Sequence, residues 1–281
     1  MTALDCPIDM QCTNPAPQGL DGRYALRMVM QPIMSLSRPH ETLNFELLLR
    51  ATDLDANISI RPDVLVMSAE RNGSIGVIDR WVMTTCLDWL EKHGSKLENT
   101  QFATLNVSAI SFDNPDFHRE LMDRLESFSY PNQLCIEITE SVALIDFNFA
   151  RQSIRDLRLR GVRVAIDDFG AGHASFNYLR ELSVDAIKID GALVKAVAQD
   201  KRCAHIVKSI CGVAHALGMK VVAEWAEDNA TVEALKKLGA DFVQGYAISK
   251  PREAHEILNA GTLGRLLRLT PDTQAKTEVN K

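Results

Sequence analysis

The sequence predicts an α/β fold, a (β/α)-barrel of the TIM type, from a pattern that recurs along most of the chain. Each time the pattern occurs, a short apolar run ends at a polar or acidic residue and is followed by a loop and a segment with helical periodicity. Alternation of strands and helices favours parallel strands. Polar residues at the carboxyl ends of many parallel strands favour a barrel with its functional site at that end.

The predicted strands and helices follow one another in a regular order. The apolar runs are Leu105-Asn106-Val107-Ser108, Cys135-Ile136-Glu137-Ile138-Thr139-Glu140, Val164-Ala165-Ile166-Asp167-Asp168-Phe169-Gly170, Ile187-Lys188-Ile189-Asp190, Val221-Val222-Ala223-Glu224 and Phe242-Val243-Gln244-Gly245. Helical periodicity is found in residues 150–159, 205–217 and 231–238. We expect the runs to be barrel strands and the periodic segments to be helices between them.

The adjacent aspartates Asp167 and Asp168 are the most informative pair of residues in the chain. Neighbouring side chains on a strand point to opposite faces, and two carboxylates this close repel each other unless a cation or a proton lies between them. A divalent metal ion is the simplest explanation, although a helix N-cap followed by a turn residue is the structural alternative. Gly170 and Gly172 follow, which indicates a loop that approaches a ligand or moves.

Length and composition predict one large barrel domain. The 281 residues are 46% hydrophobic, which is enough for a sizeable core, and a net charge of −6 argues against a groove for polymeric nucleic acid. The six cysteines show no CxxC spacing, and the sequence has neither a membrane span nor a signal peptide. We therefore expect a cytoplasmic protein, with a flexible segment at residues 1–22, a barrel at 23–268 and a polar tail at 269–281.

Eight short motifs carry a family resemblance that extends from about residue 28 to 251. They are Gln31-Pro32-Ile33, Glu46-Leu47-Leu48-Leu49-Arg50, Asn106-Val107-Ser108, Glu137-Ile138-Thr139-Glu140, Asp167-Asp168-Phe169-Gly170, Lys188-Ile189-Asp190, Ala223-Glu224 and Gln244-Gly245-Tyr246. In this order they resemble the EAL-domain cyclic di-GMP phosphodiesterases. The resemblance implies a (β/α)8 barrel in which one strand is antiparallel to the others.

The resemblance also implies hydrolysis of one phosphodiester of cyclic di-GMP, which gives linear pGpG. In-line attack on a phosphodiester needs an activated water and neutralisation of charge on the phosphate, which two nearby metal ions supply together. Carboxylate and amide oxygens suit Mg²⁺ or Mn²⁺. The expected partners are thus cyclic di-GMP and two divalent ions.

Residue by residue, the resemblance assigns one metal ion to Glu46, Asn106, Glu137 and Asp167, and the other to Asp167, Asp168 and Glu224. Asp167 would bridge the two ions. Lys188, with Glu46 and Glu224, would form the catalytic centre, Lys188 lying beside the attacking water and either positioning it or stabilising developing charge. Structural alternatives remain open: Glu46 could face solvent, Lys188 could extend to solvent, and Asn106 could form an Asx-turn.

Other residues are expected to bind the substrate or support the metal ligands. The substrate-binding set is Gln31, Leu49, Arg50, Asp168 and Gln244, of which Arg50 suits a phosphate through its planar guanidinium. Glu140 and Glu227 would support the ligands, and Glu140 would anchor the loop that contains Gly170 and Gly172.

Departures from the family pattern leave alternatives to consider. Leu47 stands where alanine is usual, and Trp225 follows Glu224 where glycine is usual. The indole could narrow the site, stack on a guanine or point away. We therefore keep as alternatives a receptor that binds cyclic di-GMP without useful turnover and a protein-interaction scaffold. A homodimer through residues 175–184 and an unidentified regulatory protein are further expected partners.

Overall fold

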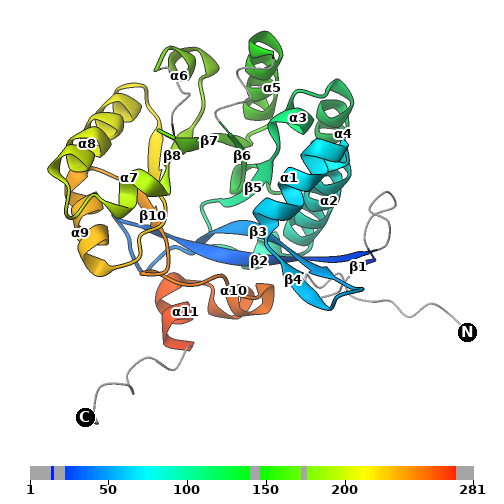
Figure 1. Cartoon of the computed structure of the whole chain (residues 1–281), viewed down its shortest axis with the longest axis horizontal. Helices are drawn as coiled ribbons and strands as arrows, with labels where there is room; N and C mark the ends of the chain where they lie inside the picture. Colours follow the sequence, from blue (N-terminus) through cyan, green and yellow to red (C-terminus); the bar gives the residue numbers. More distant parts are fainter. Residues whose placement is uncertain (1–13, 16–22, 140–145, 172–175, 270–281) are drawn as a thin grey trace, which may run out of the picture.

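A closed barrel of eight strands forms the centre of the computed structural model, which describes residues 14–15, 23–139, 146–171 and 176–269 (Figure 1). The barrel strands are β2 (Tyr24–Ser35), β3 (Asn44–Asp53), β5 (Ala103–Val107), β6 (Leu134–Thr139), β7 (Arg163–Phe169), β8 (Ala186–Ile189), β9 (Lys220–Ala223) and β10 (Phe242–Gln244). Two short strands, β1 (Asn14–Pro15) and β4 (Ile58–Ile60), pair with β2 and β3. The predicted α/β barrel is therefore confirmed.

Strand β2 gives the barrel its unusual topology. It pairs antiparallel with both β3 and β10, whereas the neighbouring pairs from β3 through β10 are parallel. The single antiparallel strand implied by the family resemblance is thus present. In this register Gln31 lies opposite Glu46, so the antiparallel strand delivers its side chains to the same end of the barrel as the parallel strands do.

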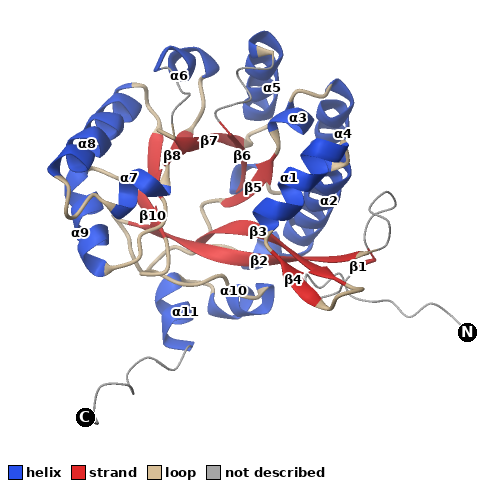
Figure 2. Ribbon diagram, in the orientation of Figure 1, coloured by secondary structure: helices blue, strands red, loops and turns tan. Residues whose placement is uncertain are grey.

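Helices surround the barrel, as Figure 2 shows. They are α1 (Pro62–Asn72), α2 (Ile75–His93), α3 (Ala109–Phe112), α4 (Pro115–Glu126), α5 (Phe147–Leu159), α6 (Phe176–Leu182), α7 (Gly191–Lys195), α8 (Lys201–Ala216), α9 (Asn229–Leu238), α10 (Ala254–Ala260) and α11 (Leu263–Leu269). Short 3₁₀ turns occupy η1 (Gly94–Lys96) and η2 (Pro131–Gln133). None of the helices described is long and apolar enough to span a membrane.

The three helices predicted from periodicity correspond to α5, α8 and α9, but each begins earlier than the apolar pattern does. Asp146, Asp200 and Asp228 cap their first turns, each carboxylate accepting a hydrogen bond from a backbone N–H of that turn. The helices α8 and α9 begin with the polar residues Lys201 and Asn229, so the apolar period alone does not detect their first turns.

The core has two parts. The larger one lies between the strands and the helices and includes Phe45, Trp89 and Phe117. The smaller one lies inside the barrel and consists of Ile33, Phe102, Cys135, Ala165 and Val222. These five residues lie toward the amino ends of the parallel strands and form a layer, called the lower layer below, that fills this half of the barrel interior. The half at the carboxyl ends of the strands is left to polar side chains.

The two predicted tails fall mostly on residues outside the described part of the chain. Within the first, Asn14 and Pro15 pair with Leu26 and Ala25 of β2. Of the second, Leu269 is the last residue of α11. The division into 1–22, 23–268 and 269–281 remains a prediction.

Candidate active site

A layer of polar side chains occupies the barrel interior at the carboxyl ends of the strands. It arises from the two-residue period of a strand, because Cys135 and Ala165 of the lower layer are followed two residues later by Glu137 and Asp167. The same spacing places Lys188 of β8 in this layer. The polar layer consists of Gln31, Glu46, Asn106, Glu137, Asp167, Lys188, Glu224 and Gln244.

The ammonium group of Lys188 lies at the centre of this layer, with only 1% of the residue exposed. Its Nζ atom is within ion-pair distance of four carboxylates: Glu137 Oε2 at 2.7 Å, Glu224 Oε1 at 2.7 Å, Asp167 Oδ1 at 3.2 Å and Glu46 Oε2 at 3.5 Å. Residues from five strands or strand ends therefore meet at one atom. The alternative in which Lys188 extends to solvent does not hold.

Burial and charge act in opposite directions on these groups. Burial by itself would lower the pKa of Lys188, but the four surrounding carboxylates raise this pKa well above its usual 10.5. Burial raises the pKa of Glu224 to about 8, although Lys188 acts in the other direction. Burial likewise raises the pKa of Glu137 well above its usual 4.5. One ammonium therefore does not balance four ionised carboxylates, and the cluster favours additional positive charge.

Glu46 differs from the other acids because its two oxygens are held by separate donors. Asn106 Nδ2 donates to Oε1 at 2.6 Å, and Gln244 Nε2 donates to Oε2 at 2.7 Å. Burial would raise the pKa of Glu46, but the charge of Lys188 and these two hydrogen bonds lower it below its usual 4.5. Glu46 is thus an oriented, ionised carboxylate inside the barrel.

Asp167, Asp168 and Glu224 form a second group of oxygens at the edge of the layer. One carboxylate oxygen from each lies within 4.8 Å of the others. Asp168 has a left-handed backbone, with φ of 56°, and its N–H donates to Asp167 Oδ1 at 2.9 Å. This turn overrides the opposite orientation that two adjacent residues of an extended strand would have. The glycine that follows, Gly170, has φ of 101°, which favours glycine.

The donor set fits divalent metal ions. Carboxylate and amide oxygens are the ligands of Mg²⁺, Mn²⁺ and Ca²⁺, and the surplus of buried carboxylates over Lys188 needs cations. Asn106 donates to Glu46 through its amide nitrogen, so within the described part of the chain its amide oxygen is left to act as a ligand atom.

A cavity of about 540 Å³ opens above the polar layer. Its walls come from six regions of the chain and are formed by Gln31, Glu46, Leu48, Asp63, Asp167, Asp168, Glu224, Trp225, Glu227, Gln244, Gly245 and Tyr246. The buried Oε1 atom of Gln244 has no hydrogen-bond partner among the described residues. The cavity thus combines a carboxylate cluster with an unused polar acceptor, as expected of a ligand site.

Not all of the predicted substrate-binding residues line this cavity. Gln31 does, and its Nε2 donates to the backbone oxygen of Ser249 at 3.4 Å. Arg50 is partly buried, and its Nη1 donates to the backbone oxygen of Leu49 at 2.8 Å. Leu49 packs against the outer core, and its neighbour Leu48 lines the cavity instead. Burial, followed by the charge of Arg27, lowers the pKa of Arg50.

The residues expected to support the metal ligands are only partly described. Glu227 lines the cavity and forms an ion pair with Lys195 at 3.1 Å. A Cβ atom at Gly170 would lie 2.7 Å from Leu193 Cδ1, so this glycine lets the loop pack on α7. Glu140 and Gly172 lie outside the described residues.

Comparison with known proteins assigns the family. Residues 18–251 match the family model described as "EAL domain". The chain belongs to the EAL domain family. This EAL domain is 34% identical over 228 residues to the "Cyclic di-GMP phosphodiesterase PdeB" of Shewanella oneidensis. The aligned residues cover 81% of this chain and 26% of the relative. It is also 34% identical over 247 residues to the "Cyclic di-GMP phosphodiesterase PdeF" of Escherichia coli, covering 88% of this chain and 32% of the relative.

Solved structures give the same assignment. The EAL domain matches "PaMucR Phosphodiesterase, c-di-GMP complex" with a TM-score of 0.73 and 29% identity, over 83% of this chain and 99% of that chain. It matches "Structure of EAL Enzyme Bd1971 - cAMP and cyclic-di-GMP bound form" with a TM-score of 0.76 and 27% identity, over 83% of this chain and 64% of that chain. The curated relatives are longer proteins, of which this EAL domain spans a quarter to a third.

Some residues of the cavity were not predicted from the sequence. The expected Leu49 is wrong as a cavity residue, and Leu48 lines the cavity because alternation along the strand places it on the same face as Glu46. Asp63 comes from the first turn of α1, and no motif marks it. Trp225 departs from the family pattern, and the sequence leaves open whether its indole narrows the site, stacks on a guanine or points away.

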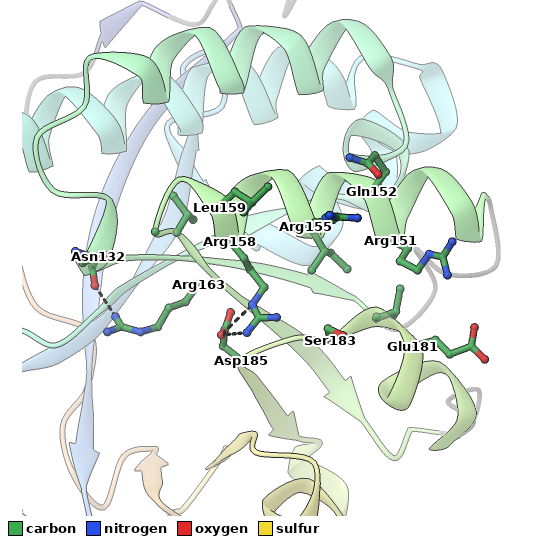
Figure 3. A pocket seen from close by; sticks show the side chains of 14 residues that line it. Asn132, Arg151, Gln152, Arg155, Arg158, Leu159, Arg163, Glu181, Ser183 and Asp185 are labelled. Atoms are coloured by element: carbon green, nitrogen blue, oxygen red, sulfur yellow. Dashed lines mark hydrogen bonds and ion pairs between the residues drawn. The ribbon is translucent and has the colours of Figure 1, made fainter.

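A second cavity of about 770 Å³ lies on the side of α5 and is richer in arginine (Figure 3). Arg158 pairs with Asp185 at 3.1 Å, and Arg163 Nη1 donates to the backbone oxygen of Asn132 at 2.6 Å, so two of its four arginines are already engaged. Among the described residues, the carboxylate group that could hold a metal ion lies in the smaller cavity. The candidate functional site is therefore the cavity at the carboxyl end of the barrel.

Proposed function

We propose that this EAL domain hydrolyses cyclic di-GMP to linear 5′-pGpG. The oxygen of a water forms a new bond to one phosphorus, the bond from that phosphorus to the 3′ oxygen breaks, and a proton ends on the 3′ hydroxyl. The observation that carries the proposal is the ring of four carboxylates around Lys188 at the floor of a cavity. The names of the relatives, and the cyclic di-GMP bound to the matched structures, support the choice of substrate.

The site would hold two divalent ions, Mg²⁺ or Mn²⁺. Glu46, Asn106, Glu137 and Asp167 would bind one ion, while Asp167, Asp168 and Glu224 would bind the other. Close approach of the latter three carboxylates and the raised pKa of Glu224 support this division. Bound there, the ions would neutralise the phosphate and make water a stronger nucleophile.

Lys188 would keep its proton throughout the reaction, since its pKa is raised far above neutrality. A permanently charged ammonium is suited to orient the attacking water and to stabilise negative charge on the phosphate, and it is a poor general base. Glu46, held by Asn106 and Gln244, would keep its orientation while the substrate binds. Glu224 would complete the catalytic centre beside Lys188.

Substrate binding would use both the floor and the rim of the cavity. The Oε1 atom of Gln244, which has no partner in the part of the chain that the structure describes, and the amide of Gln31 would hydrogen-bond the dinucleotide. Arg50 would contact a phosphate, because its guanidinium has no ion pair in the described part of the chain. Leu49 would act only through the backbone that positions Arg50, and Glu227 and Gly170 would support the metal-binding turn.

The EAL domain would assemble as a homodimer through the region of residues 175–184, and an unidentified protein would regulate it. Ser175 lies outside the described residues, and α6 (Phe176–Leu182) follows directly. Sedimentation velocity over a hundredfold range of protein concentration tests the dimer. A monomer at every concentration would remove this part of the proposal.

The experiment for the function is hydrolysis of cyclic di-GMP by the purified protein with Mg²⁺ or Mn²⁺, followed by separation of products. Glu46→Ala and Lys188→Ala should abolish the formation of pGpG. Glu91→Ala is the matched control, because Glu91 bonds Ser129 on the surface and should be dispensable. If the wild type forms no pGpG but still binds cyclic di-GMP, the protein is a receptor and the proposal is wrong.

A further inference from the structure

Trp225 is an exposed aromatic residue beside the metal-binding cluster, and 58% of it is accessible to solvent. It directly follows Glu224 and lines the same cavity as Asp167 and Asp168. Its backbone is left-handed, with φ of 55°. Large aromatic residues rarely adopt this conformation, which costs free energy that glycine would not lose. A strained, exposed indole at the mouth of a ligand cavity needs an explanation.

One face of the indole is held against helix α7. A Cβ atom at Gly191 would lie 2.5 Å from the indole Cγ, so the ring rests directly on this glycine. Lys195 Nζ lies 4.4 Å from the centre of the ring and also pairs with Glu227 at 3.1 Å. Gly191 and Lys195 are four residues apart on α7, so the indole packs on one face of this helix. The rest of the indole is left to the cavity and the solvent.

The turn that carries Trp225 is fixed to the strand end that carries Tyr246. The N–H of Ala226 donates to the oxygen of Gln244 at 3.0 Å, and the N–H of Ala247 donates to the oxygen of Ala226 at 2.9 Å. These bonds fix the backbone next to Trp225 at the rim of the cavity. An aromatic surface of this kind, fixed on one side and free on the other, is what stacking of a nucleobase requires.

We propose that Trp225 is a purine-stacking residue, which binds one guanine of the dinucleotide on its free face and so sets substrate affinity. The inference rests on the proposed cyclic di-GMP hydrolysis. It adds a base subsite that belongs to this chain, because Trp225 occupies a position where a small residue would be unstrained, and Gly191 leaves the space that the indole fills. Lys195 and Glu227 act by positioning the ring.

Steady-state kinetics of Trp225→Gly, Trp225→Leu and Trp225→Phe test the proposal. Loss of stacking should raise the KM of the glycine and leucine variants by about 5- to 150-fold, the range that one base–aromatic contact supplies. The kcat should change by less than about threefold, since no metal ligand is altered. The phenylalanine variant should recover most of the affinity, because it keeps an aromatic face. A leucine variant as good as the phenylalanine variant would overturn the proposal.

Gly191→Ala provides an independent test that leaves Trp225 in the sequence. The added methyl group would displace the indole, so KM should rise as in the leucine variant while kcat is retained. Thermal unfolding separates a loss of stacking from misfolding of the variants. Trp225→Gly relieves a strained backbone, so its melting temperature should stay within about 3 °C of the wild type.

Binding in a chelator distinguishes failure of the proposal from failure of the function. Cyclic di-GMP should quench the tryptophan fluorescence of the metal-free wild type, and the quenching should disappear in Trp225→Gly, which retains Trp81 and Trp89. Quenching without any turnover would support the stacking residue and refute the hydrolase. Turnover in the wild type with the same KM in Trp225→Gly would refute the stacking residue alone.

Discussion

The two ends of the barrel use charged side chains in opposite ways. At the amino ends of the strands, carboxylates are matched by cations and backbone donors. Asp241 accepts hydrogen bonds from Lys220 Nζ at 2.7 Å and from the N–H of Val221 at 2.9 Å, and His215 Nε2 lies at 2.8 Å. Asp185 accepts from the N–H of Val164 at 2.9 Å, with Arg158 at 3.1 Å.

At the carboxyl ends of the strands, the balance is missing. Four carboxylates share Lys188, and two non-glycine residues, Asp168 and Trp225, have a left-handed backbone. Matched charges at the amino end stabilise the barrel, whereas the surplus of negative charge at the other end costs stability and creates affinity for cations. This contrast is expected of a (β/α)-barrel, in which the residues at the amino ends of the strands stabilise the fold and those at the carboxyl ends form the functional site.

The largest effect should be the difference between replacing the buried lysine at the carboxyl end and the exposed lysine at the amino end. Lys188→Met removes the cation from a buried cluster, so the metal-free protein should lose about 3 to 5 kcal/mol of unfolding free energy. Turnover should fall at least about 100-fold. Lys220→Met breaks a pair in which the lysine side chain is 63% exposed, which should cost less than about 1 kcal/mol.

Denaturant unfolding in a chelator and an assay of pGpG formation measure both variants. Equal losses of stability would remove the proposed contrast between the two ends. Full activity in Lys188→Met would show that the ammonium has no role in the reaction.

The next largest effect should be on stabilisation by metal ions, which should depend on a carboxylate at the carboxyl end of the barrel and not on one at the amino end. At a concentration 100 times the dissociation constant, Mg²⁺ or Mn²⁺ should stabilise the wild type by about 2.7 kcal/mol. Asp167→Asn should lose most of this gain, since Asp167 is shared by both proposed metal sites. Asp185→Asn should be less stable than the wild type yet gain as much from metal. Thermal unfolding with and without metal measures this, and an undiminished gain in Asp167→Asn would contradict the site.

The pH dependence of stability should have opposite signs for Glu224 at the carboxyl end and Asp241 at the amino end. Burial raises the pKa of Glu224 from its usual 4.5 to about 8, so the folded, metal-free protein holds a proton that the unfolded chain releases. The resulting stabilisation is complete below about pH 4.5 and is lost as the pH rises toward about 8, by at most about 1.4 kcal/mol per pH unit. Burial would raise the pKa of Asp241, but Lys220, His215 and Val221 lower it below its usual 3.8. Its contribution is present above that pH and is lost on acidification.

Unfolding free energies in a chelator from pH 3 to 9 test this pair of signs. Glu224→Gln should flatten the decline toward alkaline pH, and Asp241→Asn should reduce the loss on acidification. If Glu224→Gln leaves the alkaline limb unchanged, the carboxyl does not hold a proton in the metal-free protein.

The sequence was most informative where the period of a strand links a core residue to a site residue. Glu137, Asp167 and Lys188 could each be found because a polar residue interrupts an apolar run. Their meeting at one ammonium could not be predicted, since Glu46 and Glu224 are 178 positions apart in the numbering and only barrel closure brings them together. The family resemblance supplied this grouping.

Other features depend on backbone conformation that local sequence does not encode. Periodicity did not indicate the antiparallel pairing of β2, because a long apolar strand reads alike in either direction. The direction of Trp225 follows from a positive φ that tryptophan rarely adopts. Asp63 reaches the cavity from α1 through tertiary packing alone.

The smallest expected effects come from two glycines that flank β7 at opposite ends of the barrel. Gly161 has φ of 87° and a Cβ there would lie 2.6 Å from Asn132 Oδ1, while Gly170 has φ of 101° and a Cβ there would lie 2.7 Å from Leu193 Cδ1. Alanine at either position should therefore cost a similar free energy of unfolding, about 1 to 2 kcal/mol.

Only Gly170→Ala should impair catalysis, because its strain falls on the turn that orients Asp168. A shift of that turn should lower kcat about 10- to 100-fold, whereas Gly161→Ala should keep the kcat of the wild type. Unfolding curves and steady-state kinetics on the two variants measure both quantities. An equal loss of kcat would mean that strain at either end of β7 reaches the site through the strand, and that the two ends of the barrel are coupled more tightly than their separate charge networks indicate.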